Sequence, residues 1–235
     1  ARLGRLPCSI RFSGRTHEAC PANQLKTEPL PASELSWRDV PKTPEQLEEK
    51  FRRDLRVLEE ETQAHPNTRW WFYLGETRKN LGDHAGAVIA YDRCAALRGW
   101  NEESAWACYQ AAVCLGELGL WCEAIDRCAT GLTRHAAVGE LAWLAGFACY
   151  QLGRYHDALA WSAMASASGM YIGVGRALPR IGFSNPAARF ELPHQLQAYC
   201  WDKLGRPDLA HAARLKESYA LSTRLGGLEP EPIAG

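Results

Sequence analysis

Leu81-Gly82-Asp83-His84-Ala85-Gly86-Ala87 is the stretch of sequence that decides the fold of this chain, because its pattern returns three more times. In every copy an alanine follows the Leu-Gly glycine by five residues, and the other copies begin at Leu118, Leu152 and Leu204. The four glycines are 37, 34 and 52 residues apart. A recurrence near 34 residues is typical of stacked helix-turn-helix repeats. The pattern therefore predicts an all-α solenoid of about four helical hairpins, a class whose usual role is binding.

Composition along the chain predicts the segments around these hairpins. Residues 1–42 hold five prolines and show no sustained period, which predicts an irregular segment with one short strand at 9–13. Thr43-Pro44-Glu45-Gln46 can form a capping box with proline at the first helical position, so a linker helix is expected over 43–66. The repeats follow over 67–216, with an insertion at 168–190. We expect 217–235 to be a helix end and a disordered tail.

The overall composition excludes several function classes. Lys plus Arg and Asp plus Glu balance at 27 each, so no whole-molecule field would attract nucleic acid. No run of about 18 apolar residues is present, and no membrane span is predicted. The nine cysteines form no Cys-x-x-Cys pair and no zinc-like cluster. This usage predicts reduced, buried thiols in a cytoplasmic protein.

The first helix of each hairpin is expected to build the inner, concave wall of the solenoid. Aromatic rings with scattered acids and amides should line it, and such a surface suits peptide side chains or sugar rings. An alternative is that half of these aromatics fill the space between repeats. The expected lining residues are Phe72, Glu76, Lys79, Trp106, Tyr109, Glu117, Trp143, Phe147, Tyr150, Gln195, Tyr199 and Asp202.

The small-residue and Leu-Gly positions of residues 67–216 resemble tetratricopeptide repeats. The chain departs from that family after Leu97, where Arg98-Gly99-Trp100-Asn101 replaces the expected proline. The resemblance implies a tetratricopeptide-like α-solenoid that binds proteins. Some chaperone-binding members capture a C-terminal carboxylate with a basic clamp. Since Lys79 is the one basic residue in the expected lining, this mode is disfavoured.

A second resemblance begins before the repeats. Ile10-Arg11-Phe12-Ser13-Gly14-Arg15-Thr16-His17-Glu18 resembles the end of the catalytic GT-A domain of family 2 glycosyltransferases. The stretch 50–59 resembles the helix that joins that domain to its repeats in the same enzymes. Stretches 66–69, 72–77 and 97–103 resemble their repeat arm, so the similarity spans about 9–216. It implies that His17, supported by Glu18, lies near a divalent metal (Mn²⁺ or Mg²⁺) and the diphosphate of a nucleotide sugar.

The family's nucleotide-binding half and its Asp-x-Asp motif do not precede His17 in this chain. The chain alone is therefore expected to hold no cofactor and to catalyse no transfer. The resemblance implies the C-terminal repeat arm of a family 2 glycosyltransferase, which would bind a protein or glycan acceptor, or a partner subunit, while the absent domain transfers the sugar. The alternative is a stand-alone tetratricopeptide scaffold for protein–protein interaction.

Overall fold

A computed structural model describes residues 41–97, 99–136, 138–170 and 185–226 of the chain. Within these ranges the regular structure is entirely helical, which confirms the predicted all-α class. The segment 1–40, including the expected strand at 9–13, lies outside them, as does 227–235. The helices are α1 Pro44–Ala64, α2 Thr68–Asn80, α3 His84–Ala96, α4 Asn101–Glu117, α5 Trp121–Arg134, α6 Gly139–Gln151, α7 Tyr155–Met170, the 3-10 helix η3 Pro186–Arg189, α8 Glu191–Lys203 and α9 Pro207–Arg224.

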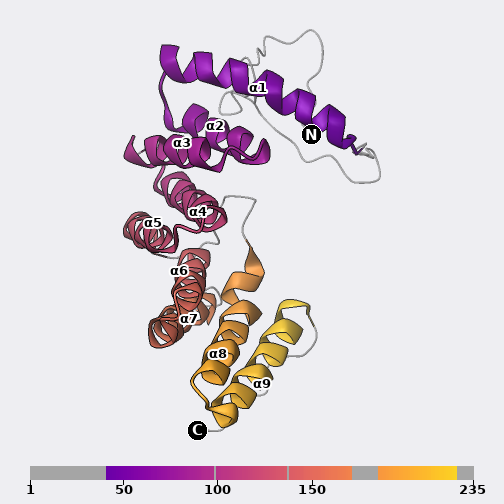
Figure 1. The fold of residues 1–235 in the computed structure, drawn as a ribbon, viewed down its shortest axis with the longest axis vertical. Coiled ribbons are helices and arrows are strands. Elements are labelled where there is room, and N and C mark those ends of the chain that lie inside the picture. Colours follow the sequence, from indigo (N-terminus) through magenta and orange to yellow (C-terminus); the bar gives the residue numbers. More distant parts are fainter. Residues whose placement is uncertain (1–40, 98, 137, 171–184, 227–235) are drawn as a thin grey trace, which may run out of the picture.

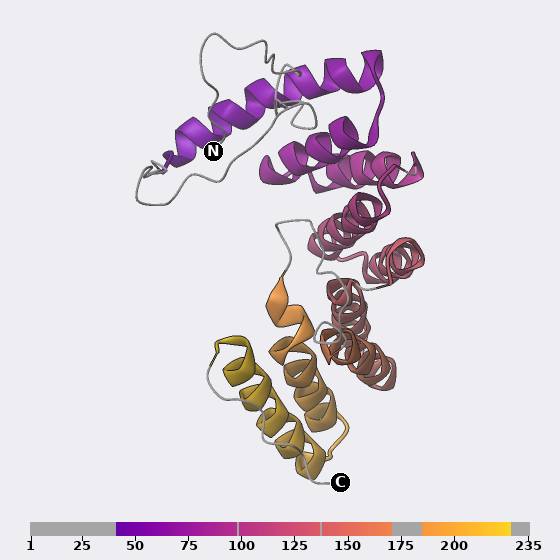
Figure 2. The same ribbon diagram turned by 180° about the vertical axis from the view of Figure 1, so that it is seen from behind.

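The helices form a curved stack of four hairpins (Figure 1). These hairpins are α2–α3, α4–α5, α6–α7 and α8–α9, and α1 packs on α2 at the N-terminal end of the stack. The first helices of successive hairpins contact one another, so α2, α4, α6 and α8 follow each other along one wall, as the view from behind also shows (Figure 2). The fold is the predicted tetratricopeptide-like α-solenoid.

The Leu-Gly pairs end the first helix of every hairpin. Gly82, Gly119, Gly153 and Gly205 have φ values of +80°, +74°, +72° and +69°, a left-handed conformation that disfavours residues with a Cβ. The residue after each glycine donates its N–H to a carbonyl five positions back; Leu120 N to Leu115 O, for example, is 2.9 Å. This is the Schellman termination of a helix. The alanine five residues after each glycine is 0% exposed, so each pattern also sets the contact between two helices.

Local sequence also sets the start of α1. Gln46 N donates to Thr43 Oγ1 at 3.3 Å, and Thr43 N donates to Gln46 Oε1 at 3.0 Å. These two bonds are the predicted capping box, and Pro44 occupies the first helical position. Leu58 is 0% exposed against Leu74 and Ala90, which attaches α1 to the first hairpin.

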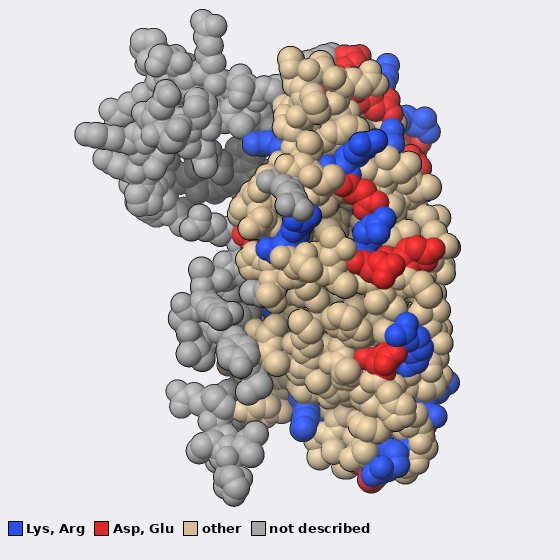
Figure 3. Space-filling view, turned by 90° about the vertical axis from the view of Figure 1, so that its left-hand side faces the viewer, with Lys and Arg blue, Asp and Glu red and all other residues tan. Residues whose placement is uncertain are grey.

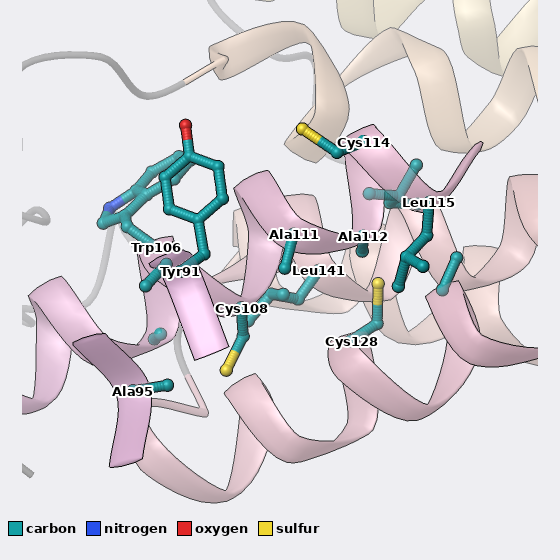
Figure 4. Close-up of a cluster of buried hydrophobic side chains, with 14 of the residues drawn as sticks. Tyr91, Ala95, Trp106, Cys108, Ala111, Ala112, Cys114, Leu115, Cys128 and Leu141 are labelled. Atoms are coloured by element: carbon teal, nitrogen blue, oxygen red, sulfur yellow. The ribbon is translucent and has the colours of Figure 1, made fainter. Parts of the chain in front are cut away.

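The core between hairpins consists largely of alanine and cysteine (Figure 4). Ala111, Ala112, Cys108 and Cys128 are at most 2% exposed, and Leu141 of the next hairpin packs on the same cluster. Small side chains allow the helices to approach closely. Burial is the largest of the causes that raise the pKa of the Cys108 and Cys114 thiols to about 11.

Cys122 should be the one described cysteine that reacts rapidly with a disulfide reagent in the folded protein. Six of the seven described cysteines are buried, and Cys122 is exposed. At pH 8 a buried thiol with a raised pKa forms little thiolate, and thiolate is the reactive species. In a Cys8→Ser/Cys20→Ser background, Ellman's reagent should titrate one fast thiol, Cys122→Ser should remove it, and urea should release the other six. A second fast thiol would contradict the packing.

Gly75→Ala should lower the free energy of unfolding by about 1–3 kcal/mol, because overpacking a filled core is costly. A Cβ on Gly75 would lie 2.5 Å from Cε1 of Tyr91. That ring cannot move aside easily, since Tyr91 is 0% exposed and its hydroxyl donates to Glu76 Oε1 at 2.5 Å. Urea denaturation measures the loss. In a Tyr91→Leu background, which opens this space, the same alanine should cost less; an equal cost would refute the explanation.

Candidate functional site

Three positions of each first helix recur along the concave wall when they are counted back from the Leu-Gly leucine. They lie nine, five and two residues before it. The ninth position holds Phe72, Tyr109, Trp143 and Gln195; the fifth holds Glu76, Val113, Phe147 and Tyr199; the second holds Lys79, Gly116, Tyr150 and Asp202. The first and second hairpins each hold one aromatic side chain at these positions, and the third hairpin holds an aromatic side chain at all three.

A groove lies between α6 and α8, the first helices of the third and fourth hairpins. Its volume is about 230 Å³. The structure brings together five of the predicted lining residues here and adds two leucines of α8. The lining consists of Trp143, Phe147, Tyr150, Leu192, Gln195, Leu196 and Tyr199.

The aromatic rings of the groove hold one another in place. Trp143 and Phe147 stack at 5.8 Å between ring centroids with an angle of 18°, and Trp121 of α5 meets Phe147 edge-on at 5.8 Å. The ring centroids of Tyr150 and Tyr199 lie 6.4 Å apart across the groove. Such ring pairs favour fixed mutual orientations. Tyr199 is 46% exposed, so one wall of the groove presents an aromatic ring to solvent.

Two polar side chains of α8 at the groove, Gln195 and Asp202, are bonded to residues of α9. Gln195 Nε2 donates to Glu217 Oε1 at 2.9 Å, which orients the amide with its oxygen as the remaining acceptor. Arg214 donates to the Asp202 carboxylate, one turn beyond Tyr199. Arg214 neutralises the Asp202 carboxylate, whereas Glu217 accepts from an uncharged amide and keeps its negative charge.

Glu76 and Lys79 of the first hairpin form a polar tie between repeats. Lys79 Nζ donates to Glu76 Oε1 at 3.0 Å and to Gln110 Oε1 of α4 at 2.9 Å. Tyr91 donates to the same Glu76 carboxylate, and burial followed by that negative charge raises the pKa of Tyr91 far above its ordinary value. The charges of Glu76 and Lys79 therefore neutralise each other in this part of the concave wall.

Three predicted lining aromatics take part in packing between repeats. Phe72 is 4% exposed and Trp106 is 0% exposed. Tyr109 meets Trp106 edge-on at 5.1 Å, and burial raises the pKa of Tyr109 to about 12. Glu117, the last residue of α4, is exposed. It follows Gly116 and is therefore outside the three recurring positions of the concave wall. His17 and Glu18 lie outside the described residues.

Sequence reasoning missed Leu192, Leu196 and Trp121. A signal for Leu192 exists, since it lies twelve residues before its Leu-Gly leucine, as Trp106 does. Trp121 belongs to a second helix and carries no such signal. It reaches the concave wall because Gly116 leaves room; a Cβ there would lie 2.8 Å from Trp121 Cζ3.

The described residues offer neither a metal-binding cluster nor a membrane-spanning helix. In these ranges no three His, Cys, Asp or Glu side chains are grouped so that they could hold a metal ion. No helix in the described part of the chain is long and apolar enough to cross a membrane. On the face shown in Figure 3, basic and acidic side chains lie next to one another between wide uncharged areas. Arg127 Nε of α5 and Asp92 Oδ1 of α3 form an ion pair between two hairpins at 2.7 Å.

Comparison with known proteins supports the fold and gives no family. No family model matches the sequence, and no curated protein matches it. A solved structure described as the crystal structure of MamA matches with a TM-score of 0.60 and 15% identity, over 80% of this chain and 99% of that one. A second MamA crystal structure has a TM-score of 0.60 and 16% identity, over 78% and 90% of the two chains.

A third similar structure is MamA residues 41 to end from Desulfovibrio magneticus RS-1. It matches with a TM-score of 0.56 and 15% identity, over 76% of this chain and 97% of that one. Identities at this level establish a shared helical architecture. They leave the glycosyltransferase resemblance resting on the sequence motifs alone.

Proposed function

We propose that this chain is a protein-interaction scaffold and that the groove between α6 and α8 is where its partner binds. The observation that carries the proposal is the set of four aromatic side chains, Trp143, Phe147, Tyr150 and Tyr199, which line one groove from two different helices. Aromatic residues are enriched in the energetically dominant centres of protein interfaces. The tetratricopeptide-like fold supports the same function, because stacked hairpins present extended concave binding surfaces.

The size and chemistry of the groove favour a protein side chain over a sugar or a small metabolite. Small-molecule sites usually enclose about 300–1,000 Å³. The groove measures about 230 Å³ and its lining is predominantly apolar. A sugar ring would bring several hydroxyls and find few partners for them, and unpaired polar groups are costly when buried. One bulky apolar side chain fits both constraints.

Site-specific photocrosslinking in the native cell tests this function. A benzophenone amino acid at Tyr199 should give a discrete protein adduct. The same probe at Ile89 on α3, which is 58% exposed and lies outside the groove, is the matched control. Identical adducts at both positions, or none at Tyr199, would count against the groove as a binding site.

A second candidate is the repeat arm of a family 2 glycosyltransferase. It is supported by the sequence resemblance, including the Gly99-Trp100 stretch between the first two hairpins. Under this candidate the groove would hold a protein acceptor or a partner subunit, while metal and nucleotide sugar would bind to a separate catalytic domain. A UDP- or GDP-sugar with Mn²⁺ should then leave the melting temperature of this chain unchanged. Sequencing the reading frame before Ala1 decides the matter, since this candidate requires an upstream α/β pattern with Asp-x-Asp.

A further inference from the structure

We infer that the α8–α9 hairpin turns on the rest of the stack as one rigid unit, and that this movement widens and narrows the groove between α6 and α8. Three features of the fold carry this inference: the division of the core at this junction, the ion pair that attaches η3 to α6, and the polar contacts that join α8 to α9. The movement belongs to the fold and needs no partner, so it goes beyond the proposed function.

The buried core is divided at the junction between the third and fourth hairpins. One cluster of buried residues runs from Phe72 on α2 to Ala148 on α6 and includes the large side chain of Trp106; within the described ranges, no residue of α8 or α9 is a buried member of it. A second, smaller cluster attaches the fourth hairpin, and its four buried residues are Cys149, Ala158, Leu196 and Cys200. Because stabilisation by burial scales with apolar area, this contact holds the fourth hairpin more weakly than the first three hold one another.

The helices α6 and α8 meet closely at one place and leave open space beside it. A Cβ on Gly146 would lie 3.1 Å from Cδ2 of Leu196, so α8 packs tightly on α6 at this point. The groove of about 230 Å³ lies between the same two helices. In Figure 1 the third hairpin is seen nearly end-on and the fourth from the side, so the stack changes direction here. A close contact beside open space allows α8 to pivot, and the width of the groove then follows the angle of the hairpin.

The ion pair between Glu140 and Arg189 sets the angle of the fourth hairpin without holding it strongly. Arg189 ends η3, directly before α8, and Glu140 lies in the first turn of α6. A buried ion pair contributes little net stability, because its attraction is offset by the loss of hydration of both charges. When the hairpin turns away, water reaches both side chains and replaces much of that attraction. The pair therefore specifies the closed position, while opening costs little free energy.

Polar contacts inside the fourth hairpin join α8 to α9 at the start, the middle and the end of α8. At the start, Arg224 Nε donates to both carboxylate oxygens of Glu191 at 2.9 Å. The contacts in the middle and at the end are Gln195–Glu217 and Asp202–Arg214. Contacts spread along the whole length of two helices fix their relative position, so α8 and α9 should move together.

Native cysteines serve as probes of this movement. Cys149 on α6 and Cys200 on α8 are 0% exposed in the small cluster, whereas Cys108 is 2% exposed in the large one. Burial is the largest of the causes that raise the pKa of Cys108 and Cys200 to about 11, so the two thiols are similarly unreactive in the closed state. In the background without the first two cysteines, labelling with N-ethylmaleimide in the absence of denaturant should modify Cys149 and Cys200 at similar initial rates. Mass spectrometry should show both rates about tenfold or more above that of Cys108 and below that of exposed Cys122. Equal labelling of Cys200 and Cys108 would overturn the inference.

Amide hydrogen exchange distinguishes a hairpin that turns from one that unfolds. Each measured rate, divided by the rate in the unfolded chain, gives the free energy of the opening that permits the reaction. A hairpin that turns as a unit keeps its intrahelical hydrogen bonds, so the amides of α8 and α9 should report a higher opening free energy than the thiols of Cys149 and Cys200. Equal opening free energies would show local unfolding and refute the rigid movement.

Two matched arginine variants separate the attachment of the hairpin from its internal contacts. Arg189→Met leaves Glu140 unpaired in the closed state and should speed the labelling of Cys200 about tenfold or more relative to Cys108. Arg224→Met removes a contact inside the hairpin, so it should speed amide exchange at the start of α8 and the end of α9 and leave the labelling of Cys200 nearly as in wild type. Equal effects of the two variants on Cys200 would contradict the inference. These measurements need no partner, so a failure of the photocrosslinking would refute the binding site and spare the movement.

Discussion

Arg189→Met should lower the free energy of unfolding by about 3–5 kcal/mol, the usual result of removing one partner from a buried ion pair. Arg189 and Glu140 have side chains that are 4% and 0% exposed. Arg189 Nε donates to Glu140 Oε2 at 3.0 Å. The pair joins η3 to the start of α6, so its loss also releases the segment that leads into α8 and the groove. Chemical denaturation at pH 8 measures the change.

The loss in Arg189→Met should depend on pH. Burial raises the pKa of the Glu140 carboxyl, and the positive charge of Arg189 opposes that rise. Without Arg189 the folded-state pKa rises further above the unfolded value of about 4.3. A raised carboxyl pKa means that stability is fully present below the unfolded value and is lost as pH rises through the folded value. The deficit relative to wild type should therefore be smaller at pH 5 than at pH 8.

The double variant Glu140→Gln/Arg189→Met is the control for this prediction. It removes both charges, so no unpaired ion remains, and it should recover most of the stability that Arg189→Met loses. If the double variant is instead less stable by the sum of the two single losses, the two side chains are not coupled and the ion pair does not attach η3 to α6.

Trp106→Ala should destabilise the fold by about 3–5 kcal/mol, as large-to-small changes of buried aromatic residues do. Trp106 is 0% exposed and lies among the side chains of the central core cluster. The cost combines lost apolar burial with a cavity beside Tyr109. Calorimetric melting should show a large drop in the transition temperature. The unfolding transition of the variant should still be cooperative.

Tyr199→Ala provides the contrast. Tyr199 is 46% exposed, so its truncation should change the free energy of unfolding by less than about 1 kcal/mol. The same substitution should abolish the partner adduct that a crosslinker at the adjacent groove residue Gln195 would form. A large stability loss at Tyr199, or a small one at Trp106, would reverse the division between packing and binding aromatics.

The division between these two residues explains how far the sequence predicted the site. Trp106 and Tyr199 both lie on first helices and both were expected on the concave wall. Whether such a ring is covered depends on the neighbouring hairpin, which no local pattern specifies. For the same reason the sequence predicted Trp143, Phe147, Tyr150 and Tyr199 as lining residues without indicating that these four share one groove.

By itself the sequence determined the hairpins. Gly82 and its three counterparts need a left-handed conformation, the following alanine needs a close helix contact, and Thr43 caps α1; each is a constraint between residues a few positions apart. Only the tertiary structure decided where the binding surface lies. The Glu140–Arg189 pair joins residues 49 positions apart, and Trp121 of a second helix packs edge-on against the groove residue Phe147. Contacts of this kind depend on how whole hairpins stack, because burial and charge pairing are properties of the assembled neighbours.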